Sequence, residues 1–174
     1  MALTASSIQP WVVELGSGTI NDDQWKASTD SVAGIWNAGE FLRKTLSGTV
    51  EIGDAGAAAK VNFVALKTHA VADGARYEPI LEIASDTIFA GQLLSGTPAQ
   101  TDIGDLRVLD VTSQIWTVGA ADGTEGNNQV EITGIWANDN WYNTGHNFAG
   151  AYGIVYFKFR EAILNVIATA ATAT

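Results

Sequence analysis

Short alternating segments, separated by turn-forming residues, constrain this chain more than any other feature of its sequence. The segments are rich in valine, isoleucine and aromatic residues, which favour strands. Stretches such as SGTP, ADGTEGNN and NDN lie between them, and the chain has 18 glycines, a residue that tight turns often require. Several short strands at regular spacing predict an all-β protein. The predicted strands cover residues 11–15, 60–69, 78–83, 87–94, 105–111, 114–118, 129–137 and 152–159.

Two of these segments carry more detailed predictions. The stretch KVNFVALKTH (60–69) is largely apolar at both alternating sets of positions, which is typical of a strand covered on both faces. The stretch LRVLDV-TS-QIWTV (106–118) predicts a hairpin whose turn is Thr112-Ser113, although this pair is not the favoured Asn-Gly type.

The predicted fold is an antiparallel β-sandwich or β-barrel, jelly-roll-like or β-tulip-like, with an extended N-terminal arm and a short C-terminal extension. Residues 1–38 form the predicted arm, because they carry little strand rhythm and two isolated tryptophans, Trp25 and Trp36. Residues 39–174 form the β-domain. The end of this domain, REAILNVIATAA (160–171), fits a last strand, a short helix or an arm.

Charge and composition exclude several classes of function. The formal net charge is −10, which repels a phosphate backbone, so we expect no direct binding of nucleic acid. The chain has no cysteine, which excludes disulfides, thiolate catalysis and cysteine-ligated zinc. No apolar run approaches the roughly 20 residues that span a bilayer, and the N-terminus lacks the pattern of a signal peptide. We therefore expect neither membrane insertion nor a secretory leader.

Catalytic signatures are missing from the sequence. It contains no G-x-S-x-G, no phosphate-binding loop and no H-E-x-x-H motif, and nothing nearby marks His69 or His146 as a catalytic base. Asp102 and Asp105 could form a carboxylate pair of the kind that glycosidases use, but they lie in a turn that leads into a strand, where aspartate commonly bonds its own backbone. The structural interpretation is therefore favoured, and we expect no enzymatic activity and no cofactor.

The loop ADGTEGNNQ (121–129) offers a candidate cation site. Asp122 or Glu125 could contribute a ligand, but the loop fails the EF-hand pattern because Thr124 and Gly126 occupy the next two ligand positions. Loops of this composition are usually plain turns, so we expect no metal.

One cluster of aromatic residues needs a separate explanation. The stretch WANDNWYNTGHNF (136–148) interleaves four aromatic residues with amides. It could stack on a sugar, form a protein–protein interface, or fold back to fill a small core. The sugar site would consist of Trp136, Asn138, Asn140, Trp141 and Asn143.

Four short motifs follow one another in the middle of the chain: SGTPA (95–99), DIG (102–104), LDV (109–111) and ITGI (132–135). Their order resembles that in the head decoration (cement) proteins and related small virion proteins of tailed bacteriophages. The preceding segment (39–59) is similar to the opening hairpin of such proteins. The resemblance covers roughly residues 39–137. It implies a homotrimer on the outer surface of the capsid, with the major capsid protein as partner.

The resemblance and the composition together favour a non-enzymatic virion protein that binds the outer capsid surface and stabilises the head. The alternative is a carbohydrate-binding β-sandwich module, which a virion could display. For the first function, the candidate interface residues are Ile8, Trp11, Val13, Trp136, Trp141 and Tyr142.

Overall fold

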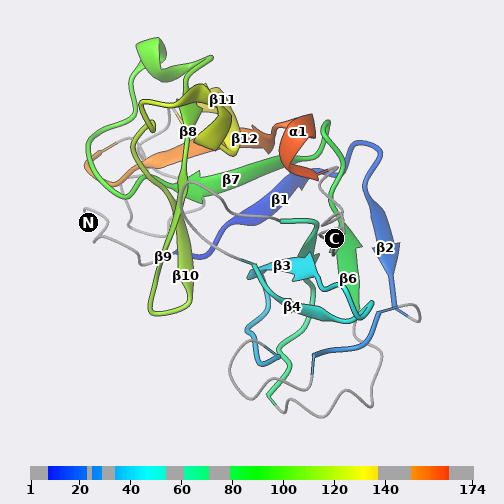
Figure 1. Ribbon diagram of the computed structural model, residues 1–174. Helices are drawn as coiled ribbons and strands as arrows, with labels where there is room; N and C mark the ends of the chain where they lie inside the picture. Colours follow the sequence, from blue (N-terminus) through cyan, green and yellow to red (C-terminus); the bar gives the residue numbers. More distant parts are fainter. Residues whose placement is uncertain are drawn as a thin grey trace.

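The protein is an antiparallel β-structure built from twelve strands among the residues that the structure describes (Figure 1). This computed structural model describes residues 8–22, 25–28, 34–53, 61–70, 79–136 and 150–164. The strands are β1 (Trp11–Glu14), β2 (Thr19–Asn21), β3 (Phe41–Lys44), β4 (Val50–Ile52), β5 (Phe63–Ala65), β6 (Ile80–Glu82), β7 (Ile88–Gln92), β8 (Leu106–Arg107), β9 (Leu109–Thr112), β10 (Ile115–Val118), β11 (Val130–Ile135) and β12 (Ile154–Phe159). Short 3-10 turns at Gln100–Asp102 and Glu125–Asn127 and one helical turn, α1 (Glu161–Leu164), complete the elements.

Two five-stranded sheets and one hairpin make up the fold. The first sheet has the strand order β1-β7-β12-β11-β8, and the second has the order β2-β6-β5-β3-β4. The two sheets occupy separate parts of the molecule, and the β9–β10 hairpin projects beside the first (Figure 1). All pairings between the named strands are antiparallel. The predicted all-β class is therefore confirmed, as a sandwich.

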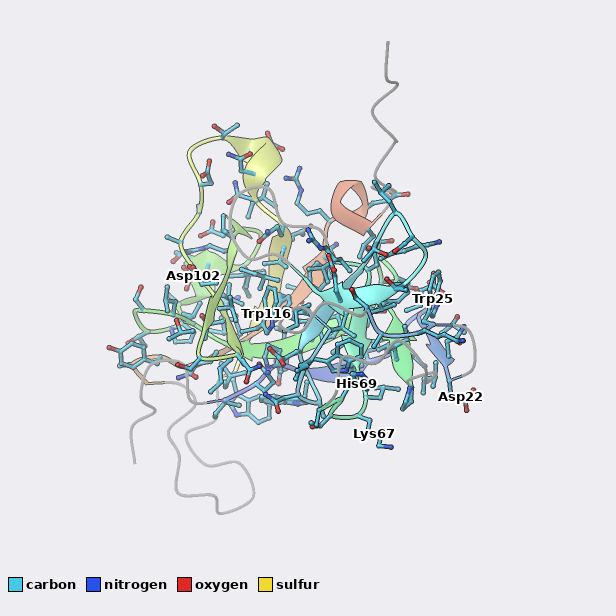
Figure 2. The ribbon with its side chains drawn as sticks, turned by 60° about the horizontal axis from the view of Figure 1, so that its bottom comes forward. Asp22, Trp25, Lys67, His69, Asp102 and Trp116 are labelled. Atoms are coloured by element: carbon cyan, nitrogen blue, oxygen red, sulfur yellow. The ribbon has the colours of Figure 1, made fainter. Side chains whose placement is uncertain are left out.

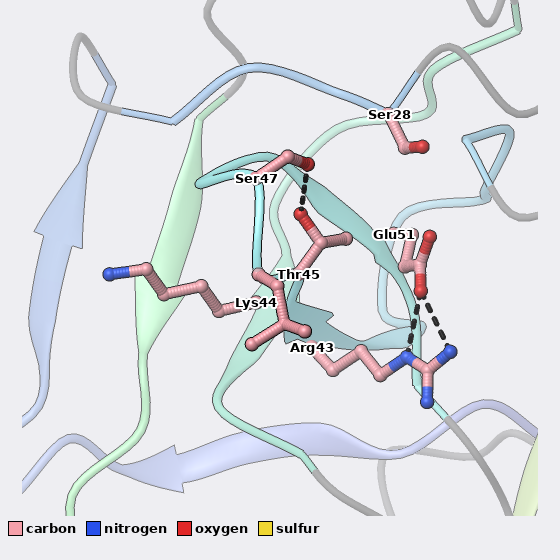
Figure 3. A pocket seen from close by; sticks show the side chains of 7 residues that line it. Ser28, Arg43, Lys44, Thr45, Ser47 and Glu51 are labelled. Carbon is pink, nitrogen blue, oxygen red and sulfur yellow. Dashed lines mark hydrogen bonds and ion pairs between the residues drawn. The ribbon is translucent and has the colours of Figure 1, made fainter. Parts of the chain in front are cut away.

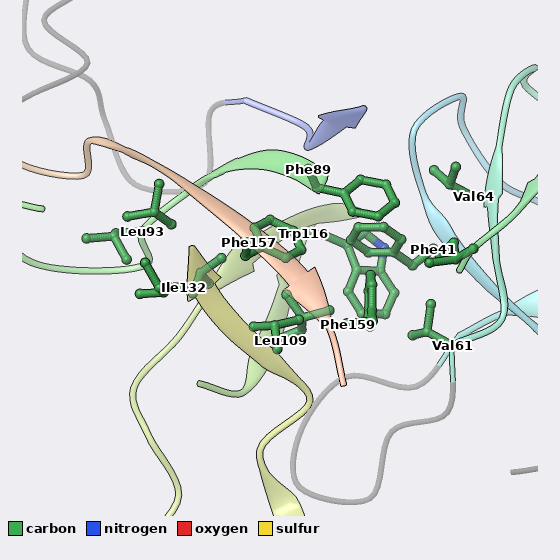
Figure 4. Packing of buried hydrophobic residues seen from close by; sticks show 14 of the residues in the cluster. Phe41, Val61, Val64, Phe89, Leu93, Leu109, Trp116, Ile132, Phe157 and Phe159 are labelled. Atoms are coloured by element: carbon green, nitrogen blue, oxygen red, sulfur yellow. The ribbon is translucent and has the colours of Figure 1, made fainter. Parts of the chain in front are cut away.

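The main core lies between the two sheets. Phe41 of β3 contributes the central ring of this core: its centroid lies 5.3 Å from that of Phe89, 5.4 Å from that of Trp116 and 5.1 Å from that of Phe159 (Figure 4). All three contacts are edge-to-face, the geometry that aromatic quadrupoles prefer. Because these rings come from both sheets and from β10, the core joins all parts of the fold.

Each sheet also carries apolar residues on its other face. On the second sheet, Leu42, Phe63 and Ala65 pack beneath Trp36, with Trp25 at the margin. The neighbouring Val64 faces the main core instead. The prediction that the strand within 60–69 is covered on both faces is thus confirmed for β5. Figure 2 shows Trp25 in the half of the molecule that holds the second sheet, apart from Trp116.

The predicted N-terminal arm needs correction. Residues 8–22 contribute β1 to the first sheet and β2 to the second, and Ala27 forms a parallel bridge with Val50. Trp36 is buried. This segment belongs to the sandwich. The sequence predicted a strand at 11–15 but not its pairing, because the partner strands lie far away in the sequence. Lys26 and Ala27 also form β-bridges.

The β9–β10 hairpin is confirmed, but its turn lies one residue later than predicted. Thr112 pairs with Ile115, so the two turn residues are Ser113 and Gln114, with φ values of 51° and 66°. Such left-handed values at both positions match a two-residue hairpin turn that usually contains glycine or asparagine. Tertiary contacts hold this turn. The backbone carbonyl of Gln114 accepts a 2.7 Å hydrogen bond from the side-chain amide of Gln9, and the side-chain oxygen of Gln114 accepts one from the side-chain amide of Asn37.

The C-terminal part of the described chain packs against the main core. After β12 the chain forms α1, so the helix is correct among the three alternatives for residues 161–164. Leu164 packs against the main core, and its carbonyl accepts a 3.0 Å hydrogen bond from Asn62. The rest of the predicted extension lies outside the described residues.

Candidate binding surface

The outer face of the first sheet carries an aromatic cluster that we treat as the candidate binding surface. Successive side chains of a strand point to opposite faces. In β12, Phe157 therefore enters the main core, while Ile154 and Tyr156, at the alternate positions, reach the outer face. Ala90 of β7 lies beside them. The outer aromatic surface consists of Ile8, Trp11, Ala90, Trp136, Tyr152, Ile154 and Tyr156.

Backbone pairing brings the rings of this surface together from distant parts of the chain. The centroid of Trp136 lies 6.4 Å from that of Trp11 and 5.8 Å from that of Tyr156. The Trp136 backbone N–H donates to the Ile154 carbonyl at 3.0 Å, which extends the β11–β12 ladder past the end of β11. A residue with a side chain at Gly134 would place its Cβ 3.0 Å from the Tyr156 ring, so glycine there leaves room for Tyr156 to lie flat.

The first described residue of the chain is tied to the same surface. The Ile8 backbone N–H donates to the side-chain oxygen of Gln92 at 3.1 Å, and Gln92 is fully buried on β7. Gln9 then reaches the opposite way, and its side-chain oxygen accepts a 2.9 Å hydrogen bond from the Trp116 backbone N–H. These two contacts fix the segment before β1 and hence the position of Trp11.

Exposure divides the cluster into a covered centre and a more accessible margin. Trp136 is only 9% exposed, whereas Ile8, Trp11, Tyr152 and Tyr156 are half-buried. Burial also raises the pKa of the Tyr156 phenol, so this group stays neutral near pH 7 and offers a hydroxyl that can donate a hydrogen bond. Half-buried aromatic rings around a covered centre are characteristic of surfaces that bind proteins.

The structure brings together three of the six predicted interface residues, Ile8, Trp11 and Trp136. Val13 lies apart from them, exposed on β1. Trp141 and Tyr142 lie outside the described residues. Sequence reasoning missed Tyr152 and Tyr156, although the alternation of YGIVYFKF could have placed Tyr156 opposite the core-facing Phe157.

Most of the predicted sugar site cannot be placed. Asn138, Asn140, Trp141 and Asn143 lie outside the described residues. The one remaining member, Trp136, has its ring packed against Trp11 and Tyr156, which leaves little of the indole face for a sugar to stack on.

Asp102 and Asp105 form a salt-bridged corner. The Arg107 guanidinium lies 3.1 Å from a carboxylate oxygen of Asp102 and 2.7 Å from one of Asp105. The other oxygen of Asp102 accepts the Ala99 backbone N–H at 2.8 Å. The Asp102 carboxylate therefore has the backbone contact that the structural interpretation expected, and the Asp105 carboxylate pairs with Arg107.

The loop around Asp122 is also closed by its own hydrogen bonds. The Asp122 carboxylate accepts the Thr124 backbone N–H at 2.7 Å and the Asn127 side-chain amide at 3.1 Å, while Glu125 pairs with Arg160 at 3.3 Å. Within the described residues, no group of three or more His, Cys, Asp or Glu side chains is arranged to hold a metal ion.

Of the two histidines, His69 lies in the described part of the chain. It is buried, its ring centroid lies 4.9 Å from that of Trp36, and its backbone forms an isolated antiparallel bridge with Trp36, which is a structural position (Figure 2). His146 lies outside the described residues. In the part of the chain that the structure describes, no helix is long and apolar enough to cross a membrane.

A pocket of about 480 Å³ lies over the β3–β4 hairpin (Figure 3). Its charged groups are already engaged: the Arg43 guanidinium lies 2.7 Å from Glu51, and the Lys44 ammonium lies 4.5 Å from the centroid of the Trp25 ring. Arg43 and Lys44 point to opposite sides of the strand (Figure 3), as neighbours on a strand must. These two cationic side chains therefore do not point to a common position in the pocket where they could bind one ligand.

Glu40 is the one carboxyl group among the described residues that is fully buried. One of its oxygens accepts the Asn37 backbone N–H, and the other has no hydrogen-bond partner. Burial raises the pKa of this carboxyl, and the bond from Asn37 opposes that effect. We find no second ionisable group bonded to it among the described residues, so its geometry is that of a buried structural residue.

Comparisons with protein-family models, with curated proteins and with solved structures find no match to this chain. The likeness to decoration proteins therefore rests on the sequence motifs alone.

Proposed function

We propose that this protein is a non-enzymatic structural protein of a tailed-phage virion that binds the outer surface of the capsid and stabilises the head. The observation that carries the proposal is the outer aromatic surface, on which half-buried rings from β1, β12 and the segments beside them surround the covered Trp136. The sequence motifs of residues 95–135 supply the choice of partner, the major capsid protein, and of a trimeric assembly.

The mechanism follows from burial of apolar area. Aromatic side chains bring a large apolar area to an interface, and a few of them usually provide most of the binding energy. A protein that binds the intact shell but not the ruptured one stabilises the intact state by mass action. Contacts of this surface across the boundary between capsid subunits would thus have to break before the shell opens.

The test compares the temperature of DNA release from three kinds of particles: particles without the protein, particles with it, and particles reconstituted with the Trp11→Ala variant. We expect the protein to raise the release temperature. We expect Trp11→Ala to lower the occupancy of the capsid sites at least tenfold, because truncating an aromatic residue that anchors an interface typically costs about 2 kcal/mol or more. Circular dichroism of the free variant checks that it folds.

Val111→Ala is the matched control, because Val111 is an exposed apolar residue on β9 that is not part of the outer aromatic surface. It should bind and protect like the unmodified protein. Release of DNA at the same temperature with and without the protein would refute head stabilisation. Undiminished binding of a folded Trp11→Ala variant would refute the role of this surface.

A further inference from the structure

Among the strands that the structure describes, those within residues 11–21 lie at the ends of both sheets. β1 pairs with β7 at the end of the first sheet, and β2 pairs with β6 at the end of the second. The bend between them is fixed by Asp86, whose carboxylate accepts the backbone N–H and the hydroxyl of Ser17 at 2.9 and 2.7 Å. We call residues 11–21 the edge ribbon.

The edge ribbon exposes apolar side chains over most of its length. Val13 is 50% exposed, Leu15 41% and Ile20 61%. Val13 lies at a bulge in the β1–β7 pairing, which turns its side chain away from the core. In β2 both Thr19 and Ile20 are exposed although they point to opposite faces, so this strand contributes hydrogen bonds to the sheet but almost no packing.

Three other strand edges among the described residues are covered or very short. Residues 26–28 cover β4: the Ser28 backbone N–H donates to the Val50 carbonyl at 2.7 Å, and the Val50 N–H donates to the Lys26 carbonyl at 2.8 Å. The side chain of Gln9 covers β10: its amide oxygen accepts a hydrogen bond from the Trp116 backbone N–H, and its amide nitrogen donates one to the Gln114 carbonyl. β8 has only two residues. Proteins manage free edges by such devices because an open edge pairs with other chains.

Charge indicates what kind of chain could pair with the edge ribbon. Glu14 and Asp22 belong to it or adjoin it, Glu82 lies opposite Thr19, and Asp86 lies at the bend. Residues 8–22 contain no lysine or arginine. The hydrogen bonds from Ser17 lower the pKa of Asp86, so this carboxylate stays ionised. A second copy of the same ribbon would bring carboxylates against carboxylates, which disfavours self-pairing.

We propose that the edge ribbon is a strand-addition site for an extended basic segment of another protein, in which lysine or arginine alternates with β-branched residues. Backbone hydrogen bonds to β1 or β2 would supply affinity, burial of Val13 and Ile20 would add to it, and the surrounding carboxylates would select basic partners. This site goes beyond the proposed capsid contact, because its exposed residues Val13, Leu15 and Ile20 are not part of the outer aromatic surface, with which the ribbon shares only Trp11.

Hydrogen exchange of the full chain tests the site with two synthetic peptides. One is an eight-residue peptide in which lysine alternates with valine and threonine, and the other has glutamate in place of lysine. With the lysine peptide we expect exchange of amides within residues 12–20 to slow at least tenfold at low salt, and we expect 0.5 M salt to reduce this effect, since surface charges are then screened. The glutamate peptide should have no effect.

The double variant Val13→Lys, Ile20→Lys should abolish the protection by the lysine peptide. Both side chains are at least half exposed, so the fold should tolerate the change. Val111→Lys on β9 is the control and should respond like the unmodified chain. The proposal is overturned if the lysine peptide does not slow exchange of these amides, if both peptides slow it equally, or if the double variant is slowed as much as the unmodified chain. It is also overturned if the amides within residues 12–20 exchange as slowly as those of β7 before any peptide is added. No capsid enters this experiment, so its result is independent of the proposed function.

Discussion

Glu40 shows how a single residue can set the pH response of the fold. Its carboxyl group is fully buried at the start of β3, and burial raises its pKa above the ordinary value of 4.5. Between 4.5 and the raised value, the folded state holds a proton that the unfolded state has released. Stability therefore falls as pH rises through this window and then levels off.

Glu40→Gln removes this ionisation and tests the argument. We expect the variant to be more stable than the unmodified protein at pH 7, by on the order of 1 kcal/mol, with the difference shrinking toward pH 4. Thermal unfolding between pH 4 and 8 measures it. Glu14→Gln on the exposed end of β1 is the control and should show no such trend. A stability difference that does not vary with pH would contradict the assignment to Glu40.

At the scale of the element, the β9–β10 turn holds two non-glycine residues in the left-handed region. This conformation costs roughly 1–2 kcal/mol per residue for an ordinary side chain. Hydrogen bonds to Gln9 and Asn37 hold the turn in place. The bond from Gln9 goes to the backbone carbonyl of Gln114, so substituting the Gln114 side chain leaves that bond intact.

Comparison of Gln114→Gly with Gln114→Ala separates backbone strain from loss of the side chain. Both variants lose the bond to Asn37, but only glycine relieves the left-handed φ of 66°. We expect the glycine variant to be more stable than the alanine variant by about 1 kcal/mol, measured by urea unfolding. Equal stabilities would mean that the turn is not strained.

At the scale of the whole molecule, one residue pair links the apolar layers. Phe41 and its neighbour Leu42 on β3 enter the main core and the outer layer of the second sheet, respectively, and Ile52 packs against both. Layers that share a strand in this way are expected to unfold together.

Unfolding should accordingly be a single transition. Tryptophan fluorescence, which reports on Trp36 and Trp116 in different layers, and far-ultraviolet circular dichroism should give the same midpoint. Phe41→Ala should lower both midpoints together, at a cost of about 3–5 kcal/mol, whereas Ile20→Ala at an exposed position should change them little. Two separate transitions would show that the sheets are independent units.

Local patterns explain which features were predictable. Alternation along 60–69 predicted a strand covered on both faces, and β5 has Phe63 on one side and Val64 on the other. The composition of the turn around Asp102 predicted a corner, and Arg107 and Ala99 bond that side chain. In these cases the residues that interact, or the rhythm that positions them, lie within a few positions in the sequence.

The sequence by itself determined that the protein is all-β, where most strands lie, and that its aspartate pair belongs to a turn. Tertiary structure decided that residues 8–22 enter both sheets, that Ile8, Trp11, Trp136 and Tyr156 meet on one face, and that Glu40 is buried. The physical reason is that strand alternation is a local property of period two, whereas the partner of each strand and the cover of each face depend on contacts between residues that lie far apart in the sequence.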